Sequence, residues 1–367
     1  MARVKLGDVA REYKATIKDT ADLPIVGLEH LTPGEITLER WDVGTENTFT
    51  KGFKKGHMLF GRRRAYLKKA ALAPFDGVCS GDITVIEAIP GKINPELLPF
   101  IIQNDLLFDY AVGNSAGSLS PRVKWESLKG YEFELPELAE QDGLVELLKA
   151  AHRTKKAYQK QITATDELVK SQFIEMFGNP ITNNMQWPTQ PLKKVAPEHT
   201  PQIPSMDKYW WLNLDMIESY SGIVIEKVYA ERSEIGSSTS TFDDTMVLYS
   251  KLRPYLNKVV VPEDFGYATT ELVGLKPDSS VLNKYFLFNL LRGDDFVSYA
   301  NGISGGAQMP RMPVKALRDF ECILPPMELQ EQFVALSEQS DKSKFELQEA
   351  IVRIDNFIKS LIQQDDN

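Results

Sequence analysis

The chain has 367 residues, 43% hydrophobic and 25% charged, which is the composition of an ordinary globular protein with two to three domains. No apolar run approaches the roughly 18 residues of a membrane span, and residues 1–6 lack a signal-peptide core, so we expect a cytoplasmic protein without membrane contacts. The net charge of −9 argues against an acidic ligand such as DNA only if the charge is spread evenly along the chain.

The first predicted region, residues 1–135, is a mixed α/β domain. Residues 81–86 predict a strand and residues 95–111 a helix, which leads into a small-residue loop at 113–122. The loop lacks the Gly-Lys-Ser/Thr ending of a P-loop, but its glycines let the backbone approach a phosphate that Arg122 can contact. The alternative is a tight surface turn with an ion-paired arginine.

The same region contains a basic run. Residues 47–75 include no Asp or Glu and carry eight cations, namely Lys51, Lys54, Lys55, Arg62, Arg63, Arg64, Lys68 and Lys69. Such a cluster favours nucleic-acid binding, although charge clusters are also common on solvated surfaces and neighbouring residues of a strand point to opposite faces. The aromatic residues Phe53, Phe60 and Tyr66 are expected in the core.

Residues 136–178 predict a long helix. Leu135-Pro136 can start it, and Gly178-Asn179-Pro180 ends it near Phe177. A coiled-coil seam is predicted from residues at alternating spacings of four and three, namely Leu144, Leu148, Ala151, Lys155, Tyr158, Ile162, Thr165 and Val169. Forty helical residues, at about 1.5 Å each, make a rod of roughly 60 Å.

The rest of the chain repeats the first half at a constant offset of 189 residues (253 − 64). Arg64-Ala65-Tyr66-Leu67 returns as Arg253-Pro254-Tyr255-Leu256, and the match continues to Lys359-Ser360. This period is far longer than that of a solenoid repeat, so each copy is expected to be a domain with its own core.

The second copy, residues 179–324, has the same predicted parts. Residues 271–275 predict a strand, 283–300 a helix and 302–311 a small-residue loop that ends in Arg311. Residues 245–262 again lack acids and carry Lys251, Arg253 and Lys258. Both copies therefore combine a locally basic domain with a glycine-containing loop.

Residues 325–367 predict a second long helix. Its seam is assigned to Phe333, Leu336, Ser340, Ser343, Leu347, Ala350, Ile354, Phe357 and Leu361. Each long helix can pack on its own domain, but two matched rods favour packing of one helix on the other. The chain can reach either orientation, and a pseudo-twofold axis between the copies gives the antiparallel one.

Taken in order, these segments resemble the DNA-specificity subunit of type I restriction-modification systems. The resemblance is carried by FKKGHMLFGRRRAYLKKAALAPFDGVCSGDITV (53–85), by MVLYSKLRPYLNKVVV (246–261) and by the Leu-Pro starts of both helices. It implies an α+β (mixed α/β) fold with target-recognition domains at 1–135 and 179–324. Spacer helices at 136–178 and 325–367 would pack as an antiparallel coiled coil.

In this family one half of a split DNA target is read by each domain, and separate chains carry the catalysis. The resemblance therefore implies double-stranded DNA, two adenine methyltransferase subunits and a restriction subunit as partners. S-adenosylmethionine, ATP and magnesium are expected on those subunits, with no cofactor in this chain. This agrees with the sequence, which lacks an Asn/Asp-Pro-Pro-Tyr/Phe motif, a nucleotide-binding loop and any metal-ligand spacing around Cys79, Cys322 or the four histidines.

The expected DNA contacts are Lys51, Lys54, Lys55, Arg62, Arg63, Arg64, Lys68, Lys69, Arg122, Lys251, Arg253, Lys258 and Arg311. The expected partner contacts are Glu140, Leu144, Glu146, Glu328, Glu331 and Phe333. Residues that specify the target should lie where the copies diverge, at 29–55 and 208–241. Two other classes stay open, a coiled-coil scaffold that binds only protein and an enzyme with an unrecognised site.

Overall fold

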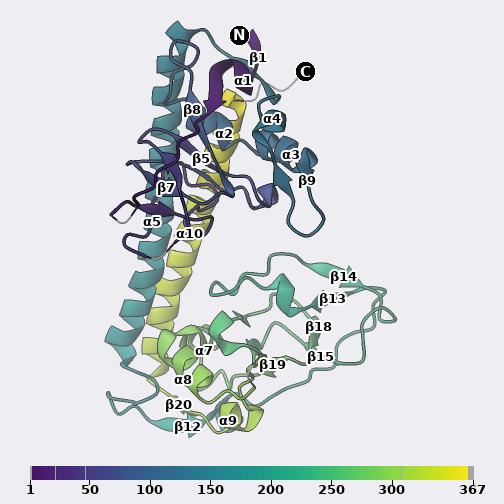
Figure 1. Cartoon of the computed structure of the whole chain (residues 1–367). Helices are drawn as coiled ribbons and strands as arrows, with labels where there is room; N and C mark the ends of the chain where they lie inside the picture. Colours follow the sequence, from purple (N-terminus) through teal and green to yellow (C-terminus); the bar gives the residue numbers. More distant parts are fainter. Residues whose placement is uncertain (1, 21, 46, 307, 363–367) are drawn as a thin grey trace. The chain divides into compact units, whose positions relative to one another are not determined.

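The computed structural model describes residues 2–20, 22–45, 47–306 and 308–362. The chain divides into two compact units, which we call unit 1 (Met1–Lys160 with Leu347–Asn367) and unit 2 (Gln161–Glu346). Each unit contains small β-sheets, short helices and parts of two long helices (Figure 1). No helix among the described residues combines the length and hydropathy that crossing a membrane requires.

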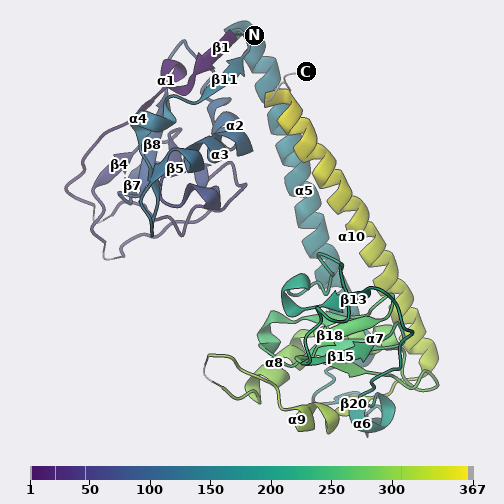
Figure 2. The ribbon, with the colours of Figure 1, turned by 90° about the vertical axis from the view of Figure 1, so that its right-hand side faces the viewer.

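The strands of unit 1 form a four-stranded sheet of order β2-β8-β5-β6, a three-stranded sheet of order β3-β7-β4 and two ladders, β1-β11 and β9-β10. Their bounds are β1 Ala2–Lys5, β2 Ala10–Glu12, β3 Ile25–Val26, β4 Lys51–Phe53, β5 Met58–Gly61, β6 Ala70–Leu72, β7 Gly77–Cys79, β8 Ile83–Ala88, β9 Ser115–Ala116, β10 Arg122–Val123 and β11 Glu132–Leu135. The short strands β3 and β7 are parallel, whereas β5 pairs antiparallel with both neighbours. The ladder of β1 and β11 lies where the chain enters the first long helix (Figure 2).

Short helices cover the larger sheet of unit 1. They are α1 Leu6–Val9, the 3-10 helix η1 Ala65–Leu67, α2 Leu98–Ile102, α3 Asp105–Gly113 and α4 Trp125–Leu128. The helix predicted over 95–111 is therefore two helices, because the Asn104 side chain accepts the Leu106 N–H and starts α3 as a new helix. Phe60 on β5 stacks on Phe108 of α3 with ring centroids 5.4 Å apart, which joins the sheet to the helices in one core.

Unit 2 also contains one four-stranded and one three-stranded sheet. The three-stranded sheet of order β17-β16-β19 corresponds to β6-β5-β8, and the sheet of order β14-β13-β18-β15 again has one parallel pair, β13 with β18. The strand bounds are β12 Thr189–Pro191, β13 Tyr209–Leu212, β14 Val228–Ala230, β15 Thr239–Phe242, β16 Val247–Ser250, β17 Val259–Val260, β18 Gly266–Thr269, β19 Leu272–Leu275 and β20 Glu321–Ile323. A final ladder joins β12 to β20.

The short helices of unit 2 are α6 Leu192–Val195, η2 Leu214–Met216, η3 Pro254–Leu256, α7 Lys284–Arg292, α8 Asp294–Gly302 and α9 Val314–Arg318. The helix predicted over 283–300 is also two helices, because Gly293 between α7 and α8 has extended backbone angles. The core of this unit contains Phe286 and Phe296 from these two helices.

The two long helices are α5 (Leu138–Phe177) and α10 (Met327–Ile362). The predicted seam of α5 is the less exposed stripe of that helix, and α5 ends at Phe177 as expected. On α10 the predicted seam is wrong at two positions, because Ser343 and Phe357 are exposed whereas Lys344 and Ile358 are half-buried. The less exposed stripe of α10 therefore includes Lys344, a residue type that a hydrophobic pattern does not select.

In unit 1, α10 runs antiparallel beside α5. Val145 and Leu148 of α5 share a core with the partly buried Ile358 and Leu361 of α10. Further along, Lys155 Nζ lies 2.6 Å from Asp355 Oδ1. A second ion pair joins α10 to the globular part, with Lys359 Nζ 2.8 Å from Asp105 Oδ2 at the start of α3.

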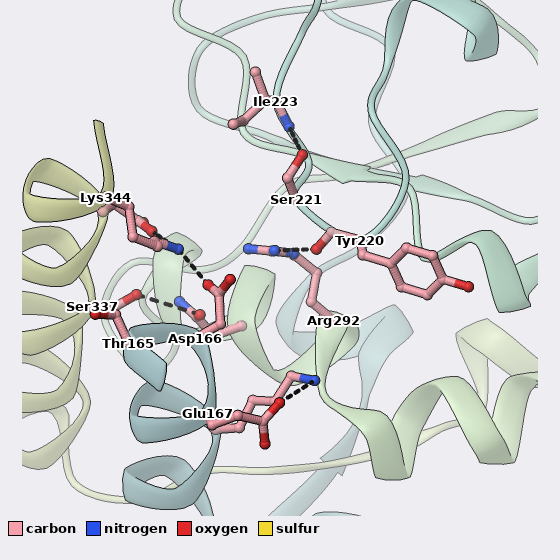
Figure 3. Close-up of polar contacts among 12 residues, drawn as sticks. Thr165, Asp166, Glu167, Tyr220, Ser221, Ile223, Arg292, Ser337 and Lys344 are labelled. Carbon is pink, nitrogen blue, oxygen red and sulfur yellow. Dashed lines mark hydrogen bonds and ion pairs between the residues drawn. The ribbon is translucent and has the colours of Figure 1, made fainter. Parts of the chain in front are cut away.

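Unit 2 contains the repeat-equivalent contacts. Lys344 Nζ lies 2.7 Å from Asp166 Oδ1, and Figure 3 shows the two side chains pointing toward one another from α10 and α5. Lys170 lies 3.1 Å from Asp294 Oδ2 at the start of α8. All four pairs obey the offset of 189, so each unit is built from one copy's domain and parts of both copies' helices.

Candidate nucleic-acid interface

The structure joins the basic run of unit 1 to its small-residue loop. The Arg64 N–H donates to Pro121 O at 2.8 Å, and the Val123 N–H donates to Arg62 O at 3.0 Å. An isolated antiparallel bridge pairs Arg63 with Arg122. We call residues 62–69 together with 113–122 the loop–turn site of unit 1.

Unit 2 has the same construction. The Arg253 N–H donates to Pro310 O at 2.7 Å, and the Met312 N–H donates to Lys251 O at 2.9 Å. Leu252 and Arg311 form the corresponding bridge. Residues 251–258 together with 302–311 are therefore the loop–turn site of unit 2, in which residue 307 lies outside the described part of the chain.

The turn in each site has an unusual backbone. The residues on either side of η1 and η3 have left-handed angles, with φ of 54° at Arg64, 50° at Lys68, 50° at Arg253 and 48° at Asn257. Each such non-glycine residue costs roughly 1 kcal/mol or more. The turn also lifts Tyr66 out of the protein to 54% exposure, so the expectation that Tyr66 is a core residue is wrong.

The last arginine of each loop is held by a carboxylate of the same unit. Arg122 Nε lies 2.7 Å from Asp82 Oδ1, and Arg311 Nη2 lies 3.0 Å from Glu271 Oε1. The ion-paired arginine is thus the interpretation that the structure bears out for these loops. The sequence reasoning missed Asp82 and Glu271, although both are acids at the offset of 189.

The Asp82 carboxyl should titrate at unusually low pH. The Arg122 guanidinium hydrogen-bonded to it holds the pKa of Asp82 below its ordinary value of 3.8. A lowered pKa means that the pair stabilises the folded protein fully above pH 3.8 and that this contribution is lost as the pH falls through the folded-state pKa. Carboxyl NMR should therefore give a midpoint below 3.8 for Asp82. D82N should lower the stability of unit 1 at pH 7 by about 1 kcal/mol.

The matched variant for this prediction is E271Q, which removes the equivalent pair from unit 2 and should leave the stability of unit 1 unchanged. A midpoint for Asp82 at or above 3.8 would contradict the ion pair seen here.

Most lysines of the basic runs are already engaged inside their own unit. Lys54 pairs with Asp76 at 2.8 Å and Lys68 with Asp105 at 2.6 Å, while Lys51 Nζ donates to Ile83 O at 2.9 Å, Lys69 Nζ to Leu28 O at 2.8 Å and Lys258 Nζ to Leu214 O at 2.6 Å. These ammonium groups stabilise the fold. Arg122 and Arg311 are likewise paired within their own units.

A smaller set of cations lacks acceptors. Among the described residues, the side chains of Lys55, Arg62, Arg64, Lys251 and Arg253 have no hydrogen-bond or ion-pair partner. The Nε atoms of Arg62 and Arg253 are also buried, and a buried donor without an acceptor costs about 1–3 kcal/mol. An anion placed on the loop–turn site would supply the missing acceptors.

Arg63 occupies the centre of the unit 1 site. Its Nη2 donates to Ser120 Oγ in the loop at 3.1 Å, and its Nη1 lies 3.5 Å from Asp82. Its Nε is buried without an acceptor. Arg63 therefore ties the loop to the turn and keeps one donor free.

The residues expected to contact partner proteins fall into two groups. Glu140, Glu146, Glu328 and Glu331 are exposed near the starts of the long helices. Leu144 is only partly exposed, since it packs against the unit 1 core. The expectation that Phe333 contacts a partner protein is wrong. Its ring is fully buried between Phe173 and Phe177, where a partner protein cannot reach it.

The described residues contain no group of three or more His, Cys, Asp or Glu side chains arranged to hold a metal ion. Cys79 and Cys322 are free thiols, and burial raises the pKa of each to about 12. Such thiols are poor nucleophiles at neutral pH.

The chain is similar to known proteins in both sequence and fold. No family model matches the chain. Over 150 residues it is 25% identical to the Type I restriction enzyme EcoDI specificity subunit of Escherichia coli, a match that spans 40% of this chain and 33% of that protein. The type I S subunit from M. genitalium superposes with a TM-score of 0.55 at 13% identity and covers 99% of this chain and 96% of its own. This chain has the fold of type I specificity subunits.

A second solved structure has a chain with a similar fold. That structure concerns the complex assembly and conformational transition of the type I R-M system. Its matching chain has a TM-score of 0.56 at 19% identity and covers 98% of this chain and 96% of its own length. The specificity-subunit resemblance inferred from the sequence is thereby confirmed. Within this specificity-subunit fold, both loop–turn sites are formed by segments that are distant in sequence.

Proposed function

We propose that the chain is the DNA-recognition subunit of a type I restriction-modification system. Unit 1 and unit 2 would each read one half of a bipartite target. The chain would position adenine methyltransferase subunits and a restriction subunit on that target and would itself carry no catalytic site. S-adenosylmethionine, ATP and magnesium would then bind to the partner chains.

The observation that carries this proposal is the recurrence of the loop–turn site. Both units keep the same strained turn, the same loop anchor and cations without acceptors, namely Arg62 and Arg64 in one and Lys251 and Arg253 in the other. A feature shared by two readers of different sequences suits a ligand that is the same everywhere. The DNA backbone is such a ligand, because phosphate contacts give affinity without sequence information.

Reading of the bases is assigned to the segments where the copies differ. In unit 2 the divergent segment 208–241 carries exposed Ile223, Ile225 and Tyr229, whereas in unit 1 the segment 29–55 carries exposed Trp41 and Val43. Apolar side chains distinguish thymine by contact with its methyl group, and nearby polar groups read the other base edges. Two different sets of side chains would give two different half-sites.

The long helices would serve as the spacer. We propose that α5 and α10 form an antiparallel coiled coil, which is supported by the antiparallel ion pairs Lys155–Asp355 in unit 1 and Lys344–Asp166 in unit 2. A stiff pair of this kind would fix the distance between half-sites, and therefore the number of unread base pairs between them.

Methyltransferase subunits would bind along the helices. The repeat-equivalent residues Leu168 on α5 and Phe357 on α10 are 53% and 43% exposed. Exposed apolar side chains on these helices are suited to a protein partner rather than to DNA. Because the two positions are equivalent, we expect two copies of one methyltransferase subunit.

The proposal predicts salt-dependent DNA binding. Fluorescence anisotropy with a random duplex, with and without a co-expressed methyltransferase chain, should give affinities whose logarithm falls with log[salt] at a slope of about −4. The four unpartnered cations of the two loop–turn sites contribute about 0.9 each to this value. Sequencing of modified bases should then reveal one split motif with a constant spacer and one modified adenine per strand. No salt-dependent binding in either condition would favour a scaffold that binds only protein.

A further inference from the structure

Leu119 is placed unlike any other apolar residue of unit 1. It lies on the loop between β9 and β10 and is 91% exposed, the largest fraction among the large apolar side chains of the described residues. Its neighbours in the loop are Asn, Ser, Ala and Gly, so it is the one large apolar side chain of residues 113–122. A leucine so fully in water contributes no burial energy to the fold, and its side chain is open to contact by a ligand.

The loop 113–122 is fixed by contacts at its base. Gly117 has φ of 114°, which side-chain-bearing residues rarely adopt, and so lets the chain turn at this point. The base is tied by the Arg64–Pro121 backbone bond, by the Arg63–Ser120 bond and by the Arg122–Asp82 ion pair. Leu119 is therefore carried on a narrow, anchored projection made of small residues.

The second copy has the same device. Gly306 has φ of 103°, at the offset of 189 from Gly117. Two large apolar residues of that loop are exposed, Ile303 at 36% where the loop begins and Met309 at 45% near its end. Met309 is the one that follows the glycine turn, as Leu119 does. The apolar type is kept while the residue and its exact position change.

The residues around Leu119 indicate which kind of ligand contacts it. Arg62 and Arg64, whose side chains lack acceptors, follow β5, and their backbone groups make the hydrogen bonds that hold the loop base. A protein interface would need a continuous apolar patch, whereas Leu119 is flanked in its loop by small or polar residues. The exposed Tyr66 and Leu67 lie on the turn at the loop base, in the same segment as Arg62 and Arg64. Duplex DNA offers the required combination, with phosphates for the arginines and an apolar space between stacked bases for the leucine.

We propose that Leu119 is a wedge that inserts between two adjacent base pairs of the unit 1 half-site and unstacks them. Met309 does the same in the half-site of unit 2. Small flanking residues let the backbone come close to the groove floor, and the cations at the base hold the phosphates on either side. Apolar wedges of this kind kink DNA at the step they enter. The inference rests on the proposed function, since it assigns a role within DNA recognition.

The test uses the complex of this chain with its methyltransferase subunits and duplexes that carry its modified motif. A 2-aminopurine is placed in turn at each position of the unit 1 half-site except the methylated adenine, because its fluorescence rises when stacking is lost. The wild-type complex should raise the signal at one step, and L119S should abolish the rise. L119S should also weaken binding by about tenfold with an unchanged salt slope, because no phosphate contact is removed.

Two controls make the result specific. L106S removes another exposed leucine of unit 1, on α3 and outside the loop–turn site, and should keep both the signal and the affinity. With 2-aminopurine placed in the unit 2 half-site instead, M309S should abolish the signal, and it should leave the signal of the unit 1 half-site unchanged. An equal rise with L119S, or no rise at any step while the wild-type complex binds its motif, would overturn the wedge alone. Absence of motif binding by the wild-type complex would overturn the proposed function and the wedge together.

Discussion

A chain that ends after Glu346 is expected to lose the fold of unit 1 while unit 2 keeps its own. The deleted part of α10 supplies Ile358, Leu361 and Ile362 to the unit 1 core, and without them Leu148 of α5 becomes exposed. Burial of such side chains contributes about 1.5–3 kcal/mol each when complete, so the loss is comparable to the 5–15 kcal/mol that holds a whole domain together.

The truncation also breaks the two ion pairs of this region, Lys155–Asp355 and Lys359–Asp105. Amide hydrogen exchange should show unit 1 unprotected, including residues far from the deletion such as those of β5. Protection in unit 2 should persist, because its core uses Phe333 and Val334 from the retained part of α10. Equal loss of protection in both units would mean that the two units do not fold separately.

Two neighbouring residues provide a matched pair of point variants for the same contact. Ile358 is half-buried against the unit 1 core, whereas Phe357 is 43% exposed. I358D should destabilise the protein by about 3 kcal/mol or more, since it places a carboxylate in an apolar core. F357D should change stability by less than about 0.5 kcal/mol. The reverse order would support the heptad phase predicted from the sequence, in which Phe357 belongs to the seam.

The second large effect is expected at the arginines of unit 1. R62A/R64A should weaken DNA binding by about 10- to 100-fold at moderate salt, because two phosphate contacts are lost. The slope of log affinity against log[salt] should become less negative by about 1.8, from 0.9 for each contact. Binding should weaken uniformly across sequences, and the modified motif should stay the same, because phosphate contacts do not read bases. Anisotropy titrations at several salt concentrations measure both quantities.

The control for this prediction changes the same charge elsewhere in unit 1. Lys92 and Lys160 are exposed and have no ion-pair partner among the described residues. K92A/K160A lowers the net charge by the same amount and should leave the slope near its wild-type value. If both double variants weaken binding equally, the effect belongs to the overall charge and the loop–turn site has no special role.

The sequence by itself determined the repeat, the two long helices and the specificity-subunit resemblance. The offset of 189 needs only residue identity, and helix positions follow from heptad spacing and from breakers such as Gly178 and Pro180. The basic runs and the glycine loops were also visible as patterns. Their contact was not, because Arg64 and Pro121 are joined by a backbone hydrogen bond that leaves no trace in side-chain type.

Only the tertiary structure decided which cations are free. A lysine in a basic run looks the same whether it faces solvent or a distant carboxylate, and Asp76 and Asp105 lie outside the acid-free stretch that made the run conspicuous. In the folded chain Phe333 is buried, Lys344 is half-buried and Leu119 is exposed to solvent. The physical reason is common to all of these, since a side chain's partners are set by residues far away in the chain, which local pattern cannot specify.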